Sequence, residues 1–294
     1  MRALSLVCLL IVFFGLSALS TAQGVPNDVS VSAQPILDAA GPRQRLAIKA
    51  VYLIGCAKSE IAGTGFLIRD GVIVTNRHVV GQCEANDLLV VSTSNEHIKI
   101  SLLVSDEDRD LALLKPATKL AGGLEVAMSA PSLPGSEVST WGYPFLYNGY
   151  YPLLSVGYIA GYRDAQNTAH TKTTKRIIVN GAFNHGNSGG PLLIAQDNKV
   201  VGVVVATYHF FPPFVSDAIQ ALQENHGGYG SGRFSMPGPD GKPINLLDQQ
   251  VIGMMLAQFY EKTQVMIGEA IAVSELRAFI SEKGRELNLA AHPR

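Results

Sequence analysis

Short apolar stretches bounded by glycine, proline, asparagine or aspartate follow one another from Leu46 to Ala206. They recur at intervals of roughly 8–15 residues without intervening helices, a pattern that favours β-barrels over a parallel sheet with crossover helices. Residues 63–68 and 72–75 flank Asp70-Gly71, which is a strong hairpin signal. The chain has 294 residues, enough for one large domain or two small ones. The sequence therefore predicts an all-β fold.

The N-terminus has the pattern of a secretory signal peptide over residues 1–22. Arg2 gives a short positive region, Leu4 to Leu19 is a run of apolar and small residues, and Ala22 ends a cleavage site. We expect an exported protein, periplasmic or extracellular. An uncleaved anchor is the alternative, although the run is short for a membrane span. Residues 23–45 are predicted to form a mobile leader that could hold a short helix, before a first strand at Leu46.

Removal of the signal peptide leaves two cysteines, Cys56 and Cys83. In an exported protein an even pair predicts a disulfide, and two free buried thiols are the alternative. No residues have the spacing of zinc ligands, and we expect neither a metal nor a cofactor. The formal net charge is −1 and no stripe of Lys and Arg is present, which argues against nucleic acid as the main partner.

The stretch Gly186-Asn187-Ser188-Gly189-Gly190-Pro191-Leu192 places a serine between glycines. Such a turn can present a hydroxyl while backbone N–H groups point at one spot, which is how a serine nucleophile and its oxyanion hole are built together. The motif is short, and a glycine-rich turn that happens to hold a serine explains it equally well.

Two residues upstream supply the partners that a serine nucleophile needs. His78 stands just past a predicted strand, and Asp110 leads directly into an apolar strand, whereas the acids at 106–108 are expected in a solvated loop. His78 would take the Ser188 proton as general base, and Asp110 would hold the right tautomer and stabilise the imidazolium. We expect the oxyanion hole to consist of the backbone N–H groups of Gly186, Asn187 and Ser188.

With these segments in this order, the sequence resembles trypsin-like serine proteases, and specifically the HtrA/DegP heat-shock branch. The matching segments are Gly63-Thr64-Gly65-Phe66, Thr75-Asn76-Arg77-His78-Val79-Val80, Asp110-Leu111-Ala112-Leu113-Leu114, Gly142-Tyr143-Pro144-Phe145, Asn180-Gly181-Ala182-Phe183-Asn184-His185-Gly186-Asn187-Ser188-Gly189-Gly190 and Gly268-Glu269-Ala270-Ile271. The resemblance implies a double six-stranded β-barrel of the chymotrypsin type, with the active site between a first barrel at 46–130 and a second at 131–290. It also implies protein or peptide substrates.

The sequence departs from the family pattern in two places. Relatives usually continue into one or two PDZ domains, whereas this chain ends, so we expect no peptide gating of that kind. Tyr208–Gln264 is an insertion in which helical spacing predicts helices over Phe214–Asn225 and Leu247 to Phe259, separated by a Gly/Pro loop at Gly227–Pro243. We expect the second helix to pack on the barrel, and a lid, an oligomer contact or a membrane-surface element are alternatives. A final helix is predicted over about residues 274–283.

Two residues on the N-terminal side of Ser188, at positions 182 and 183, bear on specificity. Ala182 stands where a trypsin-like enzyme would hold Asp, so the resemblance disfavours a preference for Arg or Lys. Phe183 is expected to line a pocket for small or medium apolar side chains. Membrane contact would be made only through the insertion or an uncleaved signal, and the oligomeric state is left open.

Three other readings compete with a serine endopeptidase. An α/β-hydrolase esterase also carries Gly-x-Ser-x-Gly, but it needs a helix after the serine and the chain order Ser, Asp, His. A non-catalytic binding or chaperone-like protein could use the same fold. A latent protease could have its cleft blocked by the insertion or by the leader.

Overall fold

The computed structural model describes residues 34–58, 61–129, 133–145, 151–166, 173–205, 233–237, 242–247, 250–254, 256–257 and 267–287. The chain divides into two units, Met1–Ser32 and Ala33–Arg294, and every described residue belongs to the second. The predicted signal peptide, the leader up to residue 33 and the predicted helix Phe214–Asn225 lie outside the described residues. Within these ranges, no helix combines the length and apolar character needed to cross a membrane.

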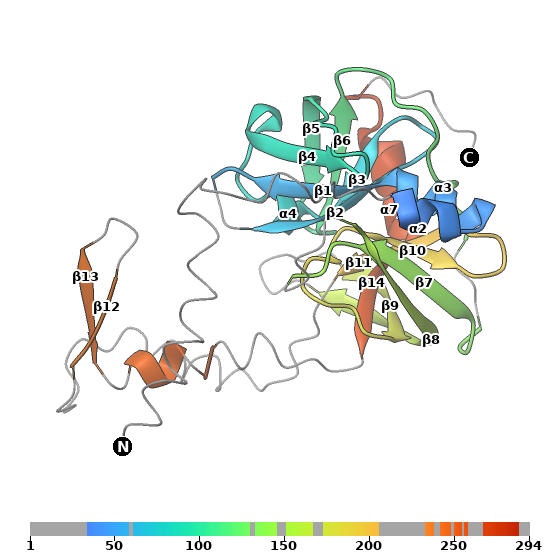
Figure 1. Ribbon diagram of the computed structural model, residues 1–294. Coiled ribbons are helices and arrows are strands. Elements are labelled where there is room, and N and C mark those ends of the chain that lie inside the picture. Colours follow the sequence, from blue (N-terminus) through green and yellow to red (C-terminus); the bar gives the residue numbers. More distant parts are fainter. Residues whose placement is uncertain are drawn as a thin grey trace. The chain divides into compact units, whose positions relative to one another are not determined.

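The first half of the described fold is a six-stranded antiparallel sheet (Figure 1). Its strands, in the sheet order β4-β1-β2-β3-β6-β5, are β4 (Leu88–Ser92), β1 (Val51–Cys56), β2 (Ala62–Leu67), β3 (Ile73–Thr75), β6 (Leu111–Pro116) and β5 (Ile100–Asp106). The segment just before β5 lies against β4, where the N–H of Ile98 donates a 2.8 Å hydrogen bond to the Val90 carbonyl. The hairpin predicted around Asp70-Gly71 is confirmed as β2 and β3.

The second half is a closed six-stranded barrel. Its strands, in order around the barrel, are β10 (Pro191–Ile194), β11 (Val200–Val205), β14 (Gly268–Ala272), β9 (Thr173–Asn180), β8 (Leu153–Gln166) and β7 (Glu137–Gly142). The expected double six-stranded, chymotrypsin-like architecture is therefore confirmed. Strand β14 follows the insertion yet lies between β11 and β9, with Glu269 opposite both Val205 and Ile178. The insertion thus leaves and re-enters the barrel at neighbouring strand ends.

The N-terminal part differs from the prediction of a strand at Leu46. Residues Gln34–Ala39 form helix α2 and Pro42–Ala50 form helix α3, so that β1 begins only at Val51. Proline is tolerated in the first helical turn because its missing N–H would have no intrahelical partner there. Ala47 and Ile48 are buried, so the apolar positions that predict a strand are the inner face of a helix.

The described part of the insertion also corrects the sequence reading. Residues Arg233–Pro237 (β12) and Pro243–Leu247 (β13) pair as antiparallel strands. Strand β12 lies within the region predicted as a Gly/Pro loop, whereas β13 begins at the last residue of that region and ends at Leu247, where the second helix was predicted to begin. The prediction was wrong there because Gly and Pro flank short paired strands as readily as they occur in irregular loops. Residues 250–254 and 256–257 are helical, which confirms part of the predicted second helix.

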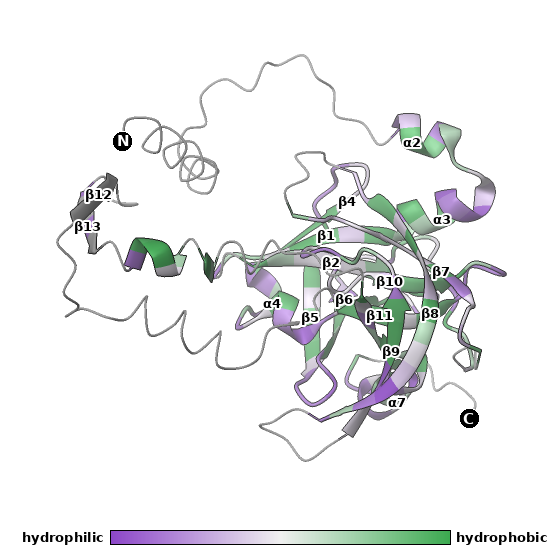
Figure 2. Cartoon of the chain, turned by 90° about the horizontal axis from the view of Figure 1, so that it is seen from below, coloured by the Kyte–Doolittle hydropathy of each residue, from purple (hydrophilic) through white to green (hydrophobic). Residues whose placement is uncertain are grey.

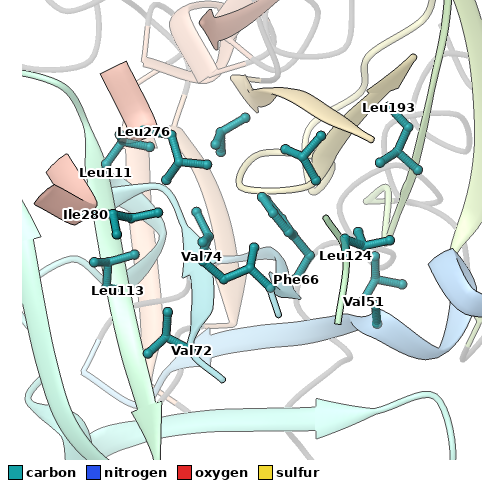
Figure 3. Packing of buried hydrophobic residues seen from close by; sticks show 14 of the residues in the cluster. Val51, Phe66, Val72, Val74, Leu111, Leu113, Leu124, Leu193, Leu276 and Ile280 are labelled. Carbon is teal, nitrogen blue, oxygen red and sulfur yellow. The ribbon is translucent and has the colours of Figure 1, made fainter. Parts of the chain in front are cut away.

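One apolar cluster joins residues of both halves to the C-terminal helix α7 (Val273–Lys283). In Figure 3, Leu276 and Ile280 of α7 lie beside Leu111 and Leu113 of β6. Figure 2 shows that apolar residues are concentrated on the strands and hydrophilic ones in turns and on helix surfaces. Because α7 follows β14 directly, this packing fixes the two barrels to each other, and each side chain of this kind contributes about 1.5–3 kcal/mol when fully buried.

The predicted disulfide is confirmed. Cys56 and Cys83 are bonded, with their Cα atoms 5.7 Å apart. The bond connects the end of β1 to the residues just after helix α4 (Arg77–Val80), which follows β3. It therefore restrains the segment on which His78 lies.

Candidate active site

His78 and Asp110 meet because β3 pairs with β6. The register sets Thr75 opposite Ala112, so the residues that follow β3 lie beside those that precede β6. The His78 ring Nδ1 is 2.8 Å from Oδ2 of Asp110, and the His78 backbone N–H donates a 3.0 Å hydrogen bond to Oδ1. Both oxygens of one carboxylate are therefore occupied by a single histidine, which fixes the ring orientation.

The backbone of Asp110 is also held in place. Its φ of 58° lies in the left-handed region, which Asp adopts more readily than most residues. Its carbonyl accepts hydrogen bonds from the Asn76 side-chain amide, at 3.0 Å, and from the Arg77 N–H, at 3.2 Å. Asn76 is wholly buried. Asn76 was not singled out from the sequence, because its role depends on a residue 34 positions away.

The Ser188 turn follows β9 and has four consecutive carbonyls that all accept hydrogen bonds. The His185 carbonyl accepts from the Phe145 N–H at 2.7 Å, and the Asn187 carbonyl accepts from the Gly190 N–H at 2.9 Å. Thr64 donates the other two bonds, from its Oγ1 to the Gly186 carbonyl at 2.6 Å and from its N–H to the Ser188 carbonyl at 2.8 Å. The turn is therefore fixed by its own backbone and by groups from β2 and from the segment after β7.

The carbonyl directions determine where two N–H groups point. The described residues contain no cis peptide bond, and in a trans peptide the N–H points opposite to the carbonyl of the preceding residue. Since the His185 and Asn187 carbonyls face protein donors, the N–H groups of Gly186 and Ser188 point to the opposite side of the turn. The Asn187 N–H instead donates to the Asn184 carbonyl at 2.9 Å. The prediction that Asn187 is an oxyanion donor is corrected accordingly.

Two positions of the turn require glycine. Gly186 has a φ of 95° and Gly189 a φ of 83°, and both values are in the range that side chains disfavour. A Cβ on Gly186 would overlap the Tyr143 carbonyl, and one on Gly189 would overlap the Thr64 carbonyl. Strand β10 follows the turn, not the helix that an α/β-hydrolase would need.

The two residues expected near a specificity pocket differ in burial. Ala182 is half-buried, whereas Phe183 is only 5% exposed and belongs to the apolar core of the second barrel. The Phe183 ring lies against Gly268, where a Cβ would be 2.7 Å from its Cγ. The absence of a side chain at Gly268 therefore makes room for this ring, a relation between residues far apart in the sequence.

Charged residues cluster on both sides of this site. Next to Asp110, the side chain of Arg109 is 3% exposed and contacts Asp106, Glu275 and Glu282. The acid at 106 is therefore part of a buried ion network, not of the solvated loop expected from the sequence. Burial lowers the pKa of Arg176. No group of three or more His, Cys, Asp or Glu residues in the described ranges has the arrangement of a metal site.

Residues 63–203 match the family model of the trypsin-like peptidase domain. This stretch is similar to that domain. His78, Asp110 and Ser188 all lie within the matched range.

Known proteins resemble the peptidase domain in sequence and in fold. The chain is 34% identical over 153 residues to Protease Do-like 1, chloroplastic, of Arabidopsis thaliana, covering 50% of this chain and 33% of that one. It is 29% identical over 176 residues to a probable periplasmic DegP-like serine endoprotease of Pseudomonas fulva, covering 59% and 32%. The chain thus spans about a third of the length of these two relatives.

A solved structure supports the fold alone. The inactive form of the Rv3671c protease of M. tuberculosis has a TM-score of 0.53 and 19% identity, covering 83% of this chain and 93% of that one. At this identity, the similarity shows only that the two proteins share a fold.

Proposed function

We propose that the chain is a serine endopeptidase that acts through an acyl-enzyme on Ser188. The observation that carries the proposal is the double hydrogen bond between His78 and Asp110, at 2.8 and 3.0 Å, in the same domain as the fixed Ser188 turn. A carboxylate that holds the Nδ1 side of a histidine leaves Nε2 free to accept a proton from a nucleophile.

The reaction would proceed in two halves. The Ser188 Oγ attacks the scissile carbonyl carbon while its proton passes to His78 Nε2. The tetrahedral intermediate then collapses, the C–N bond breaks, and the leaving amine takes that proton. In the second half, water gives a proton to His78 and attacks the acyl carbon. The C–O bond to Ser188 then breaks, His78 returns the proton to Ser188 Oγ, and the carboxylic acid leaves. Asp110 would stabilise the imidazolium without itself accepting the proton.

Negative charge develops on the substrate oxygen in both halves. The N–H groups of Gly186 and Ser188 would bind it, since their peptide planes are already held by hydrogen bonds to His185 and Asn187. A donor that is positioned before the reaction costs no reorganisation during it, and removal of one typically lowers kcat about 10²–10³-fold.

The substrate preference is proposed to be for small or medium apolar side chains before the scissile bond. Ala182 offers no carboxylate to a basic side chain, and the Phe183 ring occupies the space beside Gly268. Cleavage of peptides that differ only at this position tests the proposal, and a clear preference for Arg would refute it.

Export to the periplasm or the cell exterior is also proposed. It is supported by the N-terminal sequence, by the Cys56–Cys83 disulfide and by similarity to a protein described as periplasmic. Detection of the mature protein in a periplasmic or culture fraction, with its N-terminus near residue 23, would support it.

A fluorophosphonate probe and an unfolded protein substrate together test the function. Wild type should be labelled and should degrade the substrate, and Ser188→Ala should do neither. Absence of labelling under all conditions would favour a binding or chaperone-like protein. The matched control is Thr140→Val, a wholly buried position that packs beneath the same turn.

A latent protease is the second candidate. It is favoured by the positions of Val205 and Gly268, which bound the insertion and lie at the barrel end where β9 leads into the Ser188 turn. In that case, labelling would appear only after the segment between these residues is shortened or cleaved.

A further inference from the structure

Thr64 lies on β2 of the first barrel, yet it is bonded to the nucleophile turn of the second barrel. It is wholly buried, and 122 positions separate it from Gly186. Its Oγ1 donates to the Gly186 carbonyl at 2.6 Å and accepts from the Tyr143 N–H at 3.0 Å. Its backbone N–H donates to the Ser188 carbonyl at 2.8 Å. Thr64 therefore donates hydrogen bonds to the carbonyls of Gly186 and Ser188, the two residues whose N–H groups are the proposed oxyanion donors.

The bond to Gly186 acts on the most adaptable residue of the turn. With no side chain and a φ of 95°, Gly186 could otherwise rotate either of its flanking peptides at little cost. The peptide before it is held by the Phe145 N–H. In the peptide after it, the Gly186 carbonyl accepts from the Thr64 hydroxyl and the Asn187 N–H donates to the Asn184 carbonyl. Removal of that hydroxyl would take away one of the two hydrogen bonds that set the ψ angle of Gly186, and the one that reaches the turn from the first barrel.

Thr64 is in turn tied to the segment that carries His78. The Thr75 hydroxyl donates a 2.7 Å hydrogen bond to the Thr64 carbonyl, and Thr75 stands three residues before His78 at the end of β3. A Cβ on Gly189 would overlap both Thr64 and Thr75, so the serine turn is in van der Waals contact with both threonines.

We propose that Thr64 is a positioning residue for the oxyanion turn, which sets the Gly186 and Ser188 peptides relative to His78. The proposal rests on the proposed function, because a role in catalysis presupposes a Ser188 nucleophile. Thr64 would act through these backbone groups and would not touch the substrate.

Three variants separate positioning from general stability. Thr64→Val keeps the shape and removes the hydroxyl, and Thr64→Ser keeps the hydroxyl and removes the methyl. Thr140→Val is the matched control, because Thr140 is also wholly buried against the turn, whereas its Oγ1 has no hydrogen-bond partner among the described residues. Cavity and burial effects are thus similar at the two threonines, and the hydrogen bonds of the Thr64 hydroxyl, to the Gly186 carbonyl and from the Tyr143 N–H, make the difference.

The kinetic readout is the split between kcat and KM on one peptide substrate. Thr64→Val should lower kcat about 10²-fold with KM changed less than about threefold, because the lost interaction supports only the charged transition state. Thr64→Ser should recover kcat to within about fivefold of wild type, and Thr140→Val should match wild type. Equal kcat for Thr64→Val and wild type, or equal losses in Thr64→Val and Thr140→Val, would overturn the proposal.

A second readout does not depend on activity. Amide hydrogen exchange, followed by mass spectrometry over residues 183–190, should be at least about tenfold faster in Thr64→Val than in wild type, with exchange in β9 and β11 unchanged. Unchanged exchange in the turn would overturn the proposal even if the protein proved to be inactive. Failure of wild type to react with the fluorophosphonate would instead overturn the proposed function, and the exchange data would still decide the role of Thr64.

Discussion

Asp110 accepts two hydrogen bonds from His78, one from the ring Nδ1 and one from the backbone N–H. Each carboxylate oxygen therefore faces a donor of the same residue. An amide has only one acceptor oxygen, so any orientation of an asparagine here sets an NH₂ group against one of the two His78 nitrogens.

Asp110→Asn should consequently select the wrong tautomer of His78. We expect kcat to fall by about 10⁴-fold with the fold intact. The control is Glu107→Gln, which neutralises an exposed carboxylate of the same turn that pairs with Arg77 at 3.2 Å. Peptide hydrolysis compared with near-ultraviolet circular dichroism checks the result. Activity of Asp110→Asn within tenfold of wild type would remove Asp110 from the triad.

Arg109 is expected to stabilise the fold by joining the Asp110 turn to α7. Its guanidinium donates to both oxygens of Glu282, at 2.9 and 2.7 Å, and lies 3.3 Å from Glu275. Arg109→Met would leave Asp106 and Glu275 largely buried without their cation, and removal of one partner of a buried pair costs about 3 kcal/mol or more.

Urea unfolding measures this cost against Lys283→Met. Lys283 pairs with Glu286 on the surface, where such a pair contributes about 0–1 kcal/mol. Similar free energies of unfolding for the two variants would show that the Arg109 network is not stabilising.

The Cys56–Cys83 bond closes a loop with a sequence separation of 27 residues. In the chain-entropy model, a loop of this size stabilises the folded state by about 3.5 kcal/mol. The double variant Cys56→Ser/Cys83→Ser should therefore unfold at lower urea concentration than oxidised wild type. Reduced wild type serves as the control, since it should behave like the variant; equal stability of all three would contradict the estimate.

Tyr143 should make stability fall in alkaline solution. Burial raises the pKa of Tyr143, and its hydroxyl has no hydrogen-bond partner in the part of the chain that the structure describes. The folded state keeps the neutral phenol, whereas the unfolded chain ionises near pH 10, so the unfolded state binds fewer protons above that pH. The stabilisation is complete below about pH 10 and is lost above it, by at most about 1.4 kcal/mol per pH unit.

Tyr143→Phe isolates this contribution. Near pH 7 the variant should be as stable as wild type or slightly more stable, because no hydrogen bond is lost. Between about pH 10 and 12, its free energy of unfolding should decline less than that of wild type. Parallel pH curves for the two proteins would contradict the expected sign.

Local patterns were enough to predict most strands and the three residues of the proposed triad. Two short apolar stretches on either side of Asp70-Gly71 located β2 and β3, and motif order selected His78 and Asp110. The sequence-based predictions failed where contacts with residues far along the chain determine how a side chain is placed. From the sequence, Asp106 is predicted to lie in a solvated loop, and only the folded chain sets Arg109 and α7 beside it. Thr64 is part of a motif in the sequence, and its bond to the Ser188 turn forms only in the folded chain.

Helix α3 shows a different limit. Residues 42–50 contain spaced apolar positions that suit a strand face as well as a helix face over so short a span. Burial of Ala47 and Ile48 on one side of a helix settles the choice, and that burial exists only once the core is formed. The Asn187 N–H was likewise misjudged, because its bond to Asn184 requires the turn geometry itself.

A protease is itself a polypeptide, so newly synthesised copies must not cleave one another. The hydrogen bonds from Thr64 to Gly186 and Ser188 cross from one barrel to the other. A chain whose second barrel has folded alone holds Ser188 in a turn that lacks both of these bonds. If the chain is the proposed endopeptidase, its nucleophile turn is therefore fully held only in a copy in which both barrels have folded and docked.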